Sequence, residues 1–306
     1  MILNQVEVSY IDIAPYLGNE FRKKIEMCCN WLDSELEIPL KGRIPEYIKN
    51  IEGYPRYRGG FSDEMYYCLQ SFFEMSQIVS LNEYLSDDRT KDFLETIKKS
   101  VYGGAFRDKI ESAEKDAARN YLFELSVASD LRKIGLDIEL SSRADITIDS
   151  LKAIIECKRV HSVKKIIARV KRAINQSKED IPHEGSLFVF VDITGVFDSS
   201  KSIMAVNETG FPYSMAPPME ESQLNDCFKE EIEELVADTI LKCSPELSAL
   251  CQGHVSGIIL NYDAIGFHVN IAQERLAVGN SKYLICNDSD MPKEMLKGYF
   301  DKFSQI

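Results

Sequence analysis

The sequence has no long hydrophobic run, and this absence excludes a membrane-spanning helix. A span needs about 18 to 20 consecutive apolar residues, and no segment of the 306 residues approaches that length. The N-terminus also lacks a basic stretch followed by an apolar one, so no secretory signal is expected. These two absences predict a cytoplasmic protein.

Cysteine and histidine are present, but not in patterns that bind zinc or form a disulfide framework. The eight cysteines include no Cys-x-x-Cys pair, and no cluster of cysteine and histidine has ligand spacing. Scattered thiols in a large intracellular chain are mostly reduced core residues. The chain also lacks repeats, low-complexity tracts and a glycine-rich phosphate-binding loop. Zinc ligation is therefore not expected.

Positive charge is scarce overall but concentrated in one segment. The formal net charge is −13, which is unfavourable for a protein that coats nucleic acid. Residues 152–178 nevertheless contain nine Lys or Arg and a single acid, Glu156. An acidic body with one basic surface suits localised contact with phosphates. The charge pattern therefore allows a nucleic-acid-binding protein with one confined interface.

Two short segments rich in isoleucine lie directly before and within this basic region, at residues 144–148 and 153–158. Their composition and alternation favour strands, and the Asp-Ser pair between them favours a turn. Residues two apart in a strand share a face. Glu156 and Lys158 should therefore emerge side by side, while Cys157 points to the opposite, apolar side.

A hairpin of these strands would place Asp145 beside Glu156. Two carboxylates and an ammonium group in one place suit the binding of a divalent metal and the activation of a water. Asp149 competes with Asp145 for this role, because the two lie four residues apart on the same face of a strand. Asp149, however, has the position of the turn residue.

A long helix is expected before the strands, at residues 107–134, with Gly135 as its C-terminal cap. Glu124 falls in the middle of an otherwise small or apolar stripe of this helix. Burying an isolated carboxylate is unfavourable unless it is paired or bound to a metal. Glu124 is therefore expected either to belong to the site or to pair with an Arg or Lys.

A basic helix is expected after the strands, at residues 163–178, with its apolar stripe turned inward. The remaining faces carry two rows of one sign: Lys165, Arg169, Arg172 and Gln176, and Lys164, Lys171, Asn175 and Lys178. Like charges four residues apart destabilise a helix slightly, and a phosphate backbone would relieve that repulsion. This helix, together with Arg159 just before it, is the expected nucleic-acid contact. The continuously apolar segment 186–193 should then form a central strand parallel to residues 153–158.

A first strand is expected at residues 136–140, directly after the long helix. The resulting order helix, three strands, helix, strand, with Asp145 on one strand and Glu156-Cys157-Lys158 on the next, resembles the PD-(D/E)xK nuclease superfamily. The resemblance covers about residues 116–194, and Ala144 stands where the family name has a proline. It implies an α/β fold with a restriction-endonuclease-like core (α-β-β-β-α-β), in which a mixed central sheet is flanked by helices.

The resemblance also implies a metal-dependent nuclease. Asp145, Glu156 and the backbone carbonyl of Cys157 would bind Mg²⁺ or Mn²⁺, Glu124 would complete the metal shell, and Lys158 would orient the attacking water. Gln176 resembles a glutamine that some members carry on this helix. The implied substrate is double-stranded DNA, cleaved by an endonuclease of restriction or antiviral defence.

Several alternatives stay open at this level. A catalytically inactive nucleic-acid-binding or scaffolding protein could keep the same fold, and an RNA-directed nuclease would use the same residues. A homodimer, or a partner protein that activates or targets the enzyme, is compatible with the sequence.

Two regions are expected on either side of a glycine-rich break after Tyr102. Residues 1–102 read as a mainly helical N-terminal region, in which 41–60 is rich in loops. Residues 103–306 read as the nuclease domain, with its core at about 107–194 and a C-terminal extension. The extension should add strands at 255–261 and 283–286 and a closing helix at 292–303.

Overall fold

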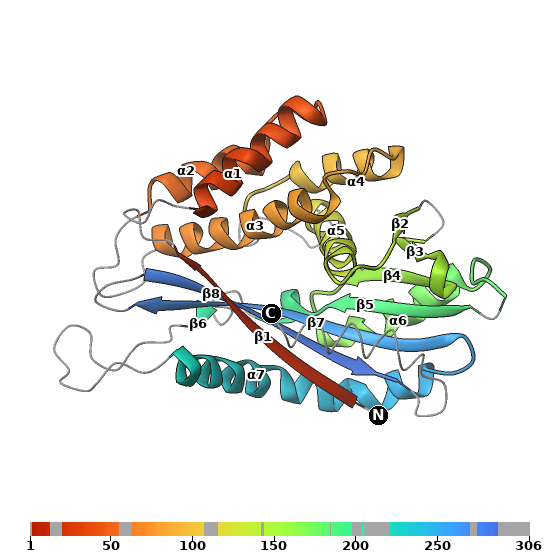
Figure 1. The fold of residues 1–306 in the computed structure, drawn as a ribbon. Coiled ribbons are helices and arrows are strands. Elements are labelled where there is room, and N and C mark those ends of the chain that lie inside the picture. The colour runs from red at the N-terminus through yellow and green to blue at the C-terminus, as the bar shows by residue number, and fades with distance from the viewer. Residues whose placement is uncertain are drawn as a thin grey trace.

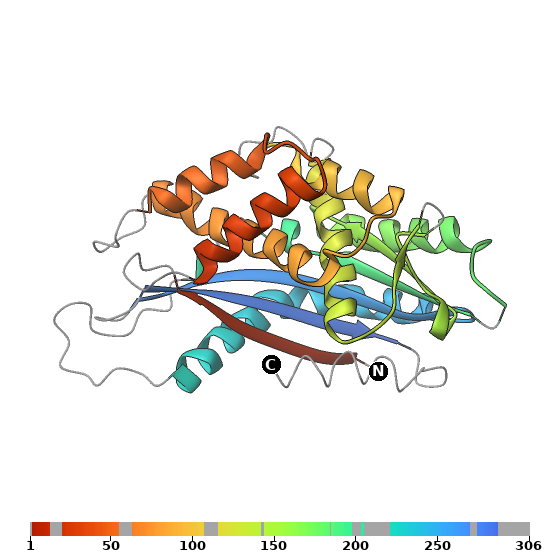
Figure 2. The same cartoon turned by 45° about the horizontal axis from the view of Figure 1, so that its top comes forward.

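A computed structural model describes residues 2–12, 20–54, 63–106, 116–141, 144–183, 185–197, 203–204, 221–269 and 274–286. These residues form one mixed, eight-stranded sheet with helices on both faces (Figures 1 and 2). The α/β class expected from the sequence is confirmed. No helix of the described ranges is long and apolar enough to cross a bilayer.

The N-terminal helices lie together on one face of the sheet (Figure 1). They are α1 (Glu20–Asn30), which continues into a π-helical turn (Trp31–Glu35), α2 (Arg43–Glu52), α3 (Asp63–Leu85) and α4 (Lys91–Val101). The expectation that residues 41–60 are rich in loops is wrong for most of the described part of this segment, because α2 occupies it. Pro45 lies in the first turn of α2, where its missing N–H has no intrahelical partner to lose.

The expected succession of six elements is present in the middle of the chain. It consists of α5 (Ala117–Lys133), β2 (Glu139–Leu140), β3 (Ile146–Ile148), β4 (Ala153–Arg159), α6 (Val163–Ser177) and β5 (Ser186–Asp192). Strands β2, β3 and β4 pair antiparallel, and β4 pairs with β5 in parallel, as a crossover through α6 requires. Gly135 follows α5 with a φ of 84°, a conformation that favours glycine, and its N–H bonds to the carbonyl of Arg132.

The C-terminal part extends the sheet further than expected. It contributes β6 (Ile203–Met204), the long helix α7 (Glu221–Leu250), β7 (Val255–Val269) and β8 (Glu274–Ile285). Strand β1 (Ile2–Asp12) pairs antiparallel along the whole of β8, so the first residues of the chain join the last described strand. The strand order is β1-β8-β7-β5-β4-β3-β2, and β6 pairs with β7 outside this path.

Two cores hold the layers together. One contains buried side chains of α1 to α5 and of one face of the sheet. It is a single cluster in space, and its members extend along the sequence from Ile25 to Cys286. The other lies between the opposite face of the sheet and helices α6 and α7. The N-terminal helices therefore share a core with the sheet across the boundary expected near residue 102.

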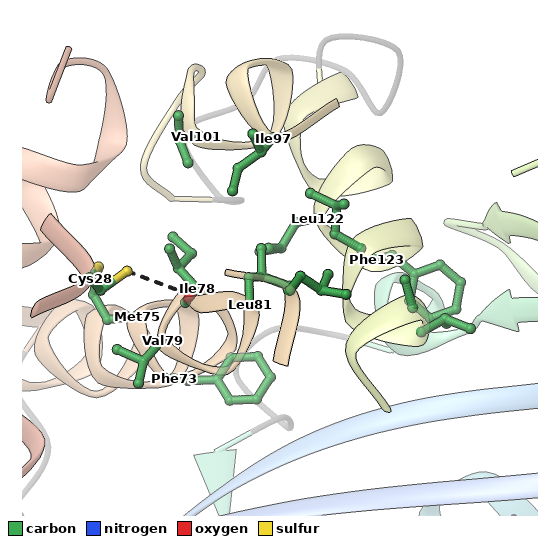
Figure 3. Packing of buried hydrophobic residues seen from close by; sticks show 14 of the residues in the cluster. Cys28, Phe73, Met75, Ile78, Val79, Leu81, Ile97, Val101, Leu122 and Phe123 are labelled. Atoms are coloured by element: carbon green, nitrogen blue, oxygen red, sulfur yellow. Dashed lines mark hydrogen bonds between the residues drawn. The ribbon is translucent and has the colours of Figure 1, made fainter. Parts of the chain in front are cut away.

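Figure 3 shows the first core from close by, where α3 contacts α1, α4 and α5. The side chains drawn there include Met75 and Ile78 of α3, Ile97 of α4 and Leu122 of α5, which belong to one cluster and are all buried. The thiol of Cys28 donates a hydrogen bond to the carbonyl of Ile78, at 3.6 Å between Sγ and O. This cysteine is a structural core residue, as expected for scattered thiols.

Some expectations fall outside the described residues. These are the last part of the loop-rich segment, at 55–60, the first part of the long helix, at 107–115, and the closing helix at 292–303.

Candidate active site

The hairpin of β3 and β4 brings Asp145 and Glu156 together. Ile146 pairs with Ile155, so the preceding Asp145 comes opposite the following Glu156. Strand β4 continues beyond the last paired residue of β3, which leaves the N–H of Cys157 without a backbone partner on that side. The carboxylate of Asp145 takes this position, and its Oδ2 accepts a hydrogen bond from Cys157 N at 2.6 Å.

Lys158 lies between the two carboxylates. Its Nζ is 2.5 Å from Oε2 of Glu156 and 3.5 Å from Oδ2 of Asp145. The second oxygen of Glu156, Oε1, accepts a hydrogen bond of 2.6 Å from the hydroxyl of Ser177 at the end of α6. The Glu156 side chain is 6% exposed and that of Asp145 is 26% exposed. Glu156 is therefore the interior member of the pair, and Asp145 opens toward solvent.

Glu124 reaches the same cluster from α5. Burial, together with the negative charges of Asp145 and Glu156, raises the pKa of its carboxyl to about 8, although Lys158 acts in the opposite direction. No hydrogen bond from another described residue reaches this carboxylate. Of the two roles considered for Glu124, membership of the acidic cluster is the one that this environment favours.

The other charges of the cluster influence one another in the same way. Burial raises the pKa of Asp145, although Lys158 and the N–H of Cys157 lower it. Burial lowers the pKa of Lys158, but the attraction of Asp145 and Glu156 outweighs it and the pKa is raised overall. Lys158 is therefore a charged ammonium at neutral pH. Burial also raises the pKa of the Cys157 thiol well above its usual range, so the thiol is protonated and is no nucleophile.

The donor set has the chemistry of a site for a hard divalent cation. The carboxylates of Asp145 and Glu156 share Lys158, and their charges act on Glu124 of α5. Oxygen ligands of this kind are those that Mg²⁺ and Mn²⁺ prefer. Among the described residues, no group of three or more His, Cys, Asp or Glu is arranged so that it could hold a metal ion. In the arrangement seen, the Lys158 ammonium bonds to Asp145 and Glu156. The donor types fit a cation, whereas the positions would fit one only after this ammonium moves aside.

Asp149, the competitor of Asp145, lies outside the cluster. It begins an exposed 3₁₀ turn (Asp149–Leu151) that follows β3, at the opposite end of the strand from Asp145. Between the two acids, the structure therefore brings only Asp145 to Glu156.

The basic helix α6 has the exposure that the sequence predicts. In the first row, Lys165, Arg172 and Gln176 are exposed and Arg169 is half-buried. All members of the second row are exposed: Lys164, Lys171, Asn175 and Lys178. None of the Lys and Arg residues of these rows forms a salt bridge with another residue of the described ranges. Their charge is available to an anionic partner.

Arg159 requires a correction, because it does not belong to this basic surface. Its side chain is 2% exposed and lies inside the molecule. Its Nε is 2.6 Å from Oδ2 of Asp192 on β5, and its Nη1 is 3.0 Å from Oδ2 of Asp116 before α5. Arg159 shares a strand face with Cys157, and that face is covered by the first core. A guanidinium held there stabilises the fold and cannot contact phosphates.

The ion pairs of Arg159 belong to a longer buried chain of alternating charges. Arg119 pairs with Asp116 at 3.0 Å and with Glu74 of α3 at 2.6 Å. Glu74 in turn pairs with Arg43 of α2 at 3.2 Å. The chain thus links α2, α3 and α5 to β4 and β5, and each charge in it has an opposite neighbour, as buried charges require.

The sequence interpretation missed Ser177, which positions Glu156. The signal was the apolar stripe of α6, whose buried members are Ile166, Val170, Ala173 and Ser177. A serine at the end of an otherwise apolar stripe points to a partner inside the molecule, because buried hydroxyls are generally hydrogen-bonded.

Comparisons with models of protein families, with curated proteins and with solved structures gave no match for this chain.

Proposed function

We propose that the protein is a metal-dependent phosphodiesterase that cleaves nucleic acid, most simply a DNA endonuclease with a restriction-endonuclease-like core. The observation that supports this proposal is the convergence of Glu124, Asp145, Glu156 and Lys158 at the open end of the β3–β4 hairpin. Structural ion pairs do not need three acids around one ammonium. Buried acids with raised pKa values, as found for Glu124 and Asp145, are more typical of functional sites.

The side chains have separate roles in this proposal. Asp145, Glu156 and Glu124, with the backbone carbonyl of Cys157, would hold Mg²⁺ or Mn²⁺, which would supply a nucleophilic hydroxide at neutral pH and neutralise charge on the phosphate. Lys158 would orient the attacking water and stabilise negative charge that develops on the phosphoryl oxygens. Ser177 would keep the Glu156 carboxylate in its orientation through the bond to Oε1.

The basic helix would bind the substrate backbone. Lys165, Arg172 and Gln176 are exposed on α6, and Ser177 at the end of the same helix donates to Glu156, so one helix links the basic surface to the acidic cluster. Contacts of this kind bind phosphates independently of sequence. Base specificity would therefore come from other parts of the chain or from a partner.

Cleavage assays test the proposal. Supercoiled plasmid, linear duplex, single-stranded DNA and RNA are incubated with the full chain and Mg²⁺ or Mn²⁺, and in parallel with a chelator. We expect metal-dependent cleavage that falls by at least about 100-fold in Asp145→Asn and Lys158→Met. The matched control is Asp149→Asn, which removes an exposed acid of the same hairpin and should leave the rate unchanged. Cleavage that survives chelation, or that is equal in Asp145→Asn and Asp149→Asn, contradicts the assignment.

A second candidate is a nucleic-acid-binding protein that does not cleave. The observation in its favour is that Lys158 bonds to both Asp145 and Glu156, an arrangement that also satisfies the carboxylates without a metal. This candidate predicts binding that is equal with and without Mg²⁺ and equal in wild type and Asp145→Asn, with no cleavage of any substrate. The RNA arm of the same assay decides between a DNA and an RNA nuclease.

A further inference from the structure

A patch of polar side chains interrupts the buried face of the sheet at β7 and β8. On the face of β7 toward α3 and α5, Asn261 and Asp263 lie between the buried Ile259 and Ile265. Across the hairpin, Asn261 pairs with Lys282 and Asp263 pairs with Asn280. The four side chains form a two-by-two patch in an otherwise apolar surface. Placing such groups inside a protein is unfavourable unless they have partners.

The two helices above this patch also present polar side chains where a core would need apolar ones. After Phe73, helix α3 places Ser76, Gln77 and Ser80 on the same side at helical spacing. After Phe123, helix α5 does the same with Ser126, Asp130 and Lys133. Figure 3 shows Phe73 on the side of α3 that faces the sheet. A helix that covers a sheet normally buries an apolar stripe, so both helices depart from this rule at the same place.

These residues enclose a cavity of about 210 Å³ between α3, α5, β7 and β8. Some of the polar groups satisfy one another. Lys282 pairs with Asp130 at 2.9 Å, and Nδ2 of Asn280 donates to Asp263 at 2.6 Å and to Asn261 at 3.0 Å. Two polar atoms of the lining stay unpaired. Ser126 Oγ and Asn280 Oδ1 are buried and have no hydrogen-bond partner among the described residues. An unpartnered acceptor and an unpartnered hydroxyl in the wall of a cavity offer hydrogen bonds that a bound polar molecule could complete.

The charge and shape of the lining restrict what that molecule can be. The lining carries two acids, Asp130 and Asp263, and two cations, Lys133 and Lys282, so its formal charge is zero. A phosphate or another strongly charged group would therefore lack compensation. Asn280 Oδ1 and the Asp263 carboxylate accept hydrogen bonds, so a ligand that pairs with them must carry N–H or O–H donors. The Ser126 hydroxyl can donate to an acceptor of the ligand. Phe73 and Phe123 add apolar ring surface on which a planar group can stack.

We propose that this cavity binds an uncharged, amino-substituted ring compound of the nucleobase or nucleoside class. Such a compound has flat faces for the phenylalanine rings and carries N–H donors beside ring acceptors at its edge. Recognition of a base by stacking and by hydrogen bonds to its edge uses these same groups. The proposal goes beyond nuclease activity and does not depend on it, because none of the lining residues belongs to the acidic cluster.

Isothermal titration calorimetry on the full chain tests the proposal. The probes are adenine, adenosine, cytosine and cytidine, and the comparison compounds are AMP, inorganic phosphate and glucose. We expect at least one base or nucleoside to bind at millimolar concentration or below and to bind more tightly than AMP. Comparison of each base with its nucleoside shows whether the cavity holds the ring alone or the ring with its sugar.

Two substitutions of Ser126 locate the binding. Ser126→Leu fills the cavity and should weaken binding by at least about tenfold. Ser126→Ala removes only an unpartnered hydroxyl, so it should leave the melting temperature unchanged and weaken binding roughly two- to tenfold, which is the contribution of one hydrogen bond. The control is Ser71→Ala, a buried serine of α3 that bonds to the carbonyl of Tyr67 away from the cavity lining. Absence of binding by every base and nucleoside overturns the proposal. So does tighter binding of phosphate or glucose, or equal binding by the folded Ser126→Ala and Ser126→Leu variants and wild type.

Discussion

At the scale of the residue, Glu124 is the group whose environment makes the sharpest prediction about metal binding. Burial and the charges of Asp145 and Glu156 raise its pKa to about 8, so at pH 7 it carries a proton. A cation must displace this proton before the carboxylate can ligate. The affinity for Mn²⁺ should therefore rise from pH 6.5 through pH 8 and level off only above about pH 9.

Calorimetry at pH 6.5, 7.5 and 8.5 measures this dependence in wild type and in Glu124→Gln. The variant has no proton to lose at this position, so we expect weaker binding that changes less with pH. An equal pH dependence in the two proteins would assign the proton to another group of the cluster and remove Glu124 from the proposed metal shell.

The same raised pKa has a consequence for the stability of the metal-free protein. The folded-state pKa of Glu124 lies above its ordinary value of 4.5. Stability from this group is therefore complete below about pH 4.5 and is lost as the pH rises toward 8. Glu124→Gln should increase the free energy of unfolding by about 2 to 4 kcal/mol at pH 8 and have little effect near pH 4.5. Urea denaturation in chelator measures the difference, with Glu139→Gln, an exposed acid of β2, as the control. A variant that is less stable than wild type at pH 8 contradicts the environment described for Glu124.

Local periodicity in the sequence is enough to predict that Asp145, Glu156 and Lys158 lie together. The two-residue period of a strand places Glu156 and Lys158 together, and a short turn limits the register that brings Asp145 opposite Glu156. The same period places Arg159 on the side of Cys157, against the core, yet its positive charge in a basic segment suggested a surface position. Its partners Asp116 and Asp192 come from other elements, and pairing between distant elements is not encoded in local pattern.

At the scale of the element, α6 carries a prediction about nucleic acid. Lys165 and Arg172 are exposed on one side of this helix. The double reversal Lys165→Glu and Arg172→Glu should weaken duplex binding strongly and reduce the slope of log affinity against log salt by about two. Lys23→Glu with Lys98→Glu changes the net charge equally on exposed residues of α1 and α4, and it should have a much smaller effect. Fluorescence anisotropy across a salt series measures both. If the two double variants lose affinity equally, the net charge of the protein matters and the face of α6 does not.

Elements with strong local signals were predicted, and those that depend on distant partners were not. The core order from α5 to β5 follows from helical periodicity, a glycine cap and a continuously apolar strand. Among the described residues, strand β1 pairs with β8 alone, more than 260 residues later in the chain, so the sequence around β1 does not predict its pairing. Helix α2 is not predicted, because Pro45 inside a glycine- and proline-containing segment suggests a loop, although the first turn of a helix tolerates proline.

At the scale of the whole molecule, the buried chain of charges and the first core tie the N-terminal helices to the sheet. Arg43 and Glu74 come from α2 and α3, Arg119 from α5, and Arg159 from the strand that also carries Glu156 and Lys158. Removing one member would leave an uncompensated buried charge, which is strongly destabilising. The N-terminal helices are thus part of the framework that holds β4 in place, whatever partner their outer surface binds.

This continuity predicts that the described parts of the chain unfold together. The single tryptophan, Trp31, follows α1 and is 1% exposed, so its fluorescence reports the N-terminal helices. Far-UV circular dichroism reports the helices and the sheet together. Because one core runs from Ile25 to Cys286, the two signals should give the same midpoint in urea, as expected of a cooperative transition. The contrary result is a tryptophan transition at a clearly lower urea concentration, with circular dichroism that changes in two steps. It would mean that residues 1–102 unfold as a separate unit. The core and the ion pairs that cross this boundary would then contribute little to stability.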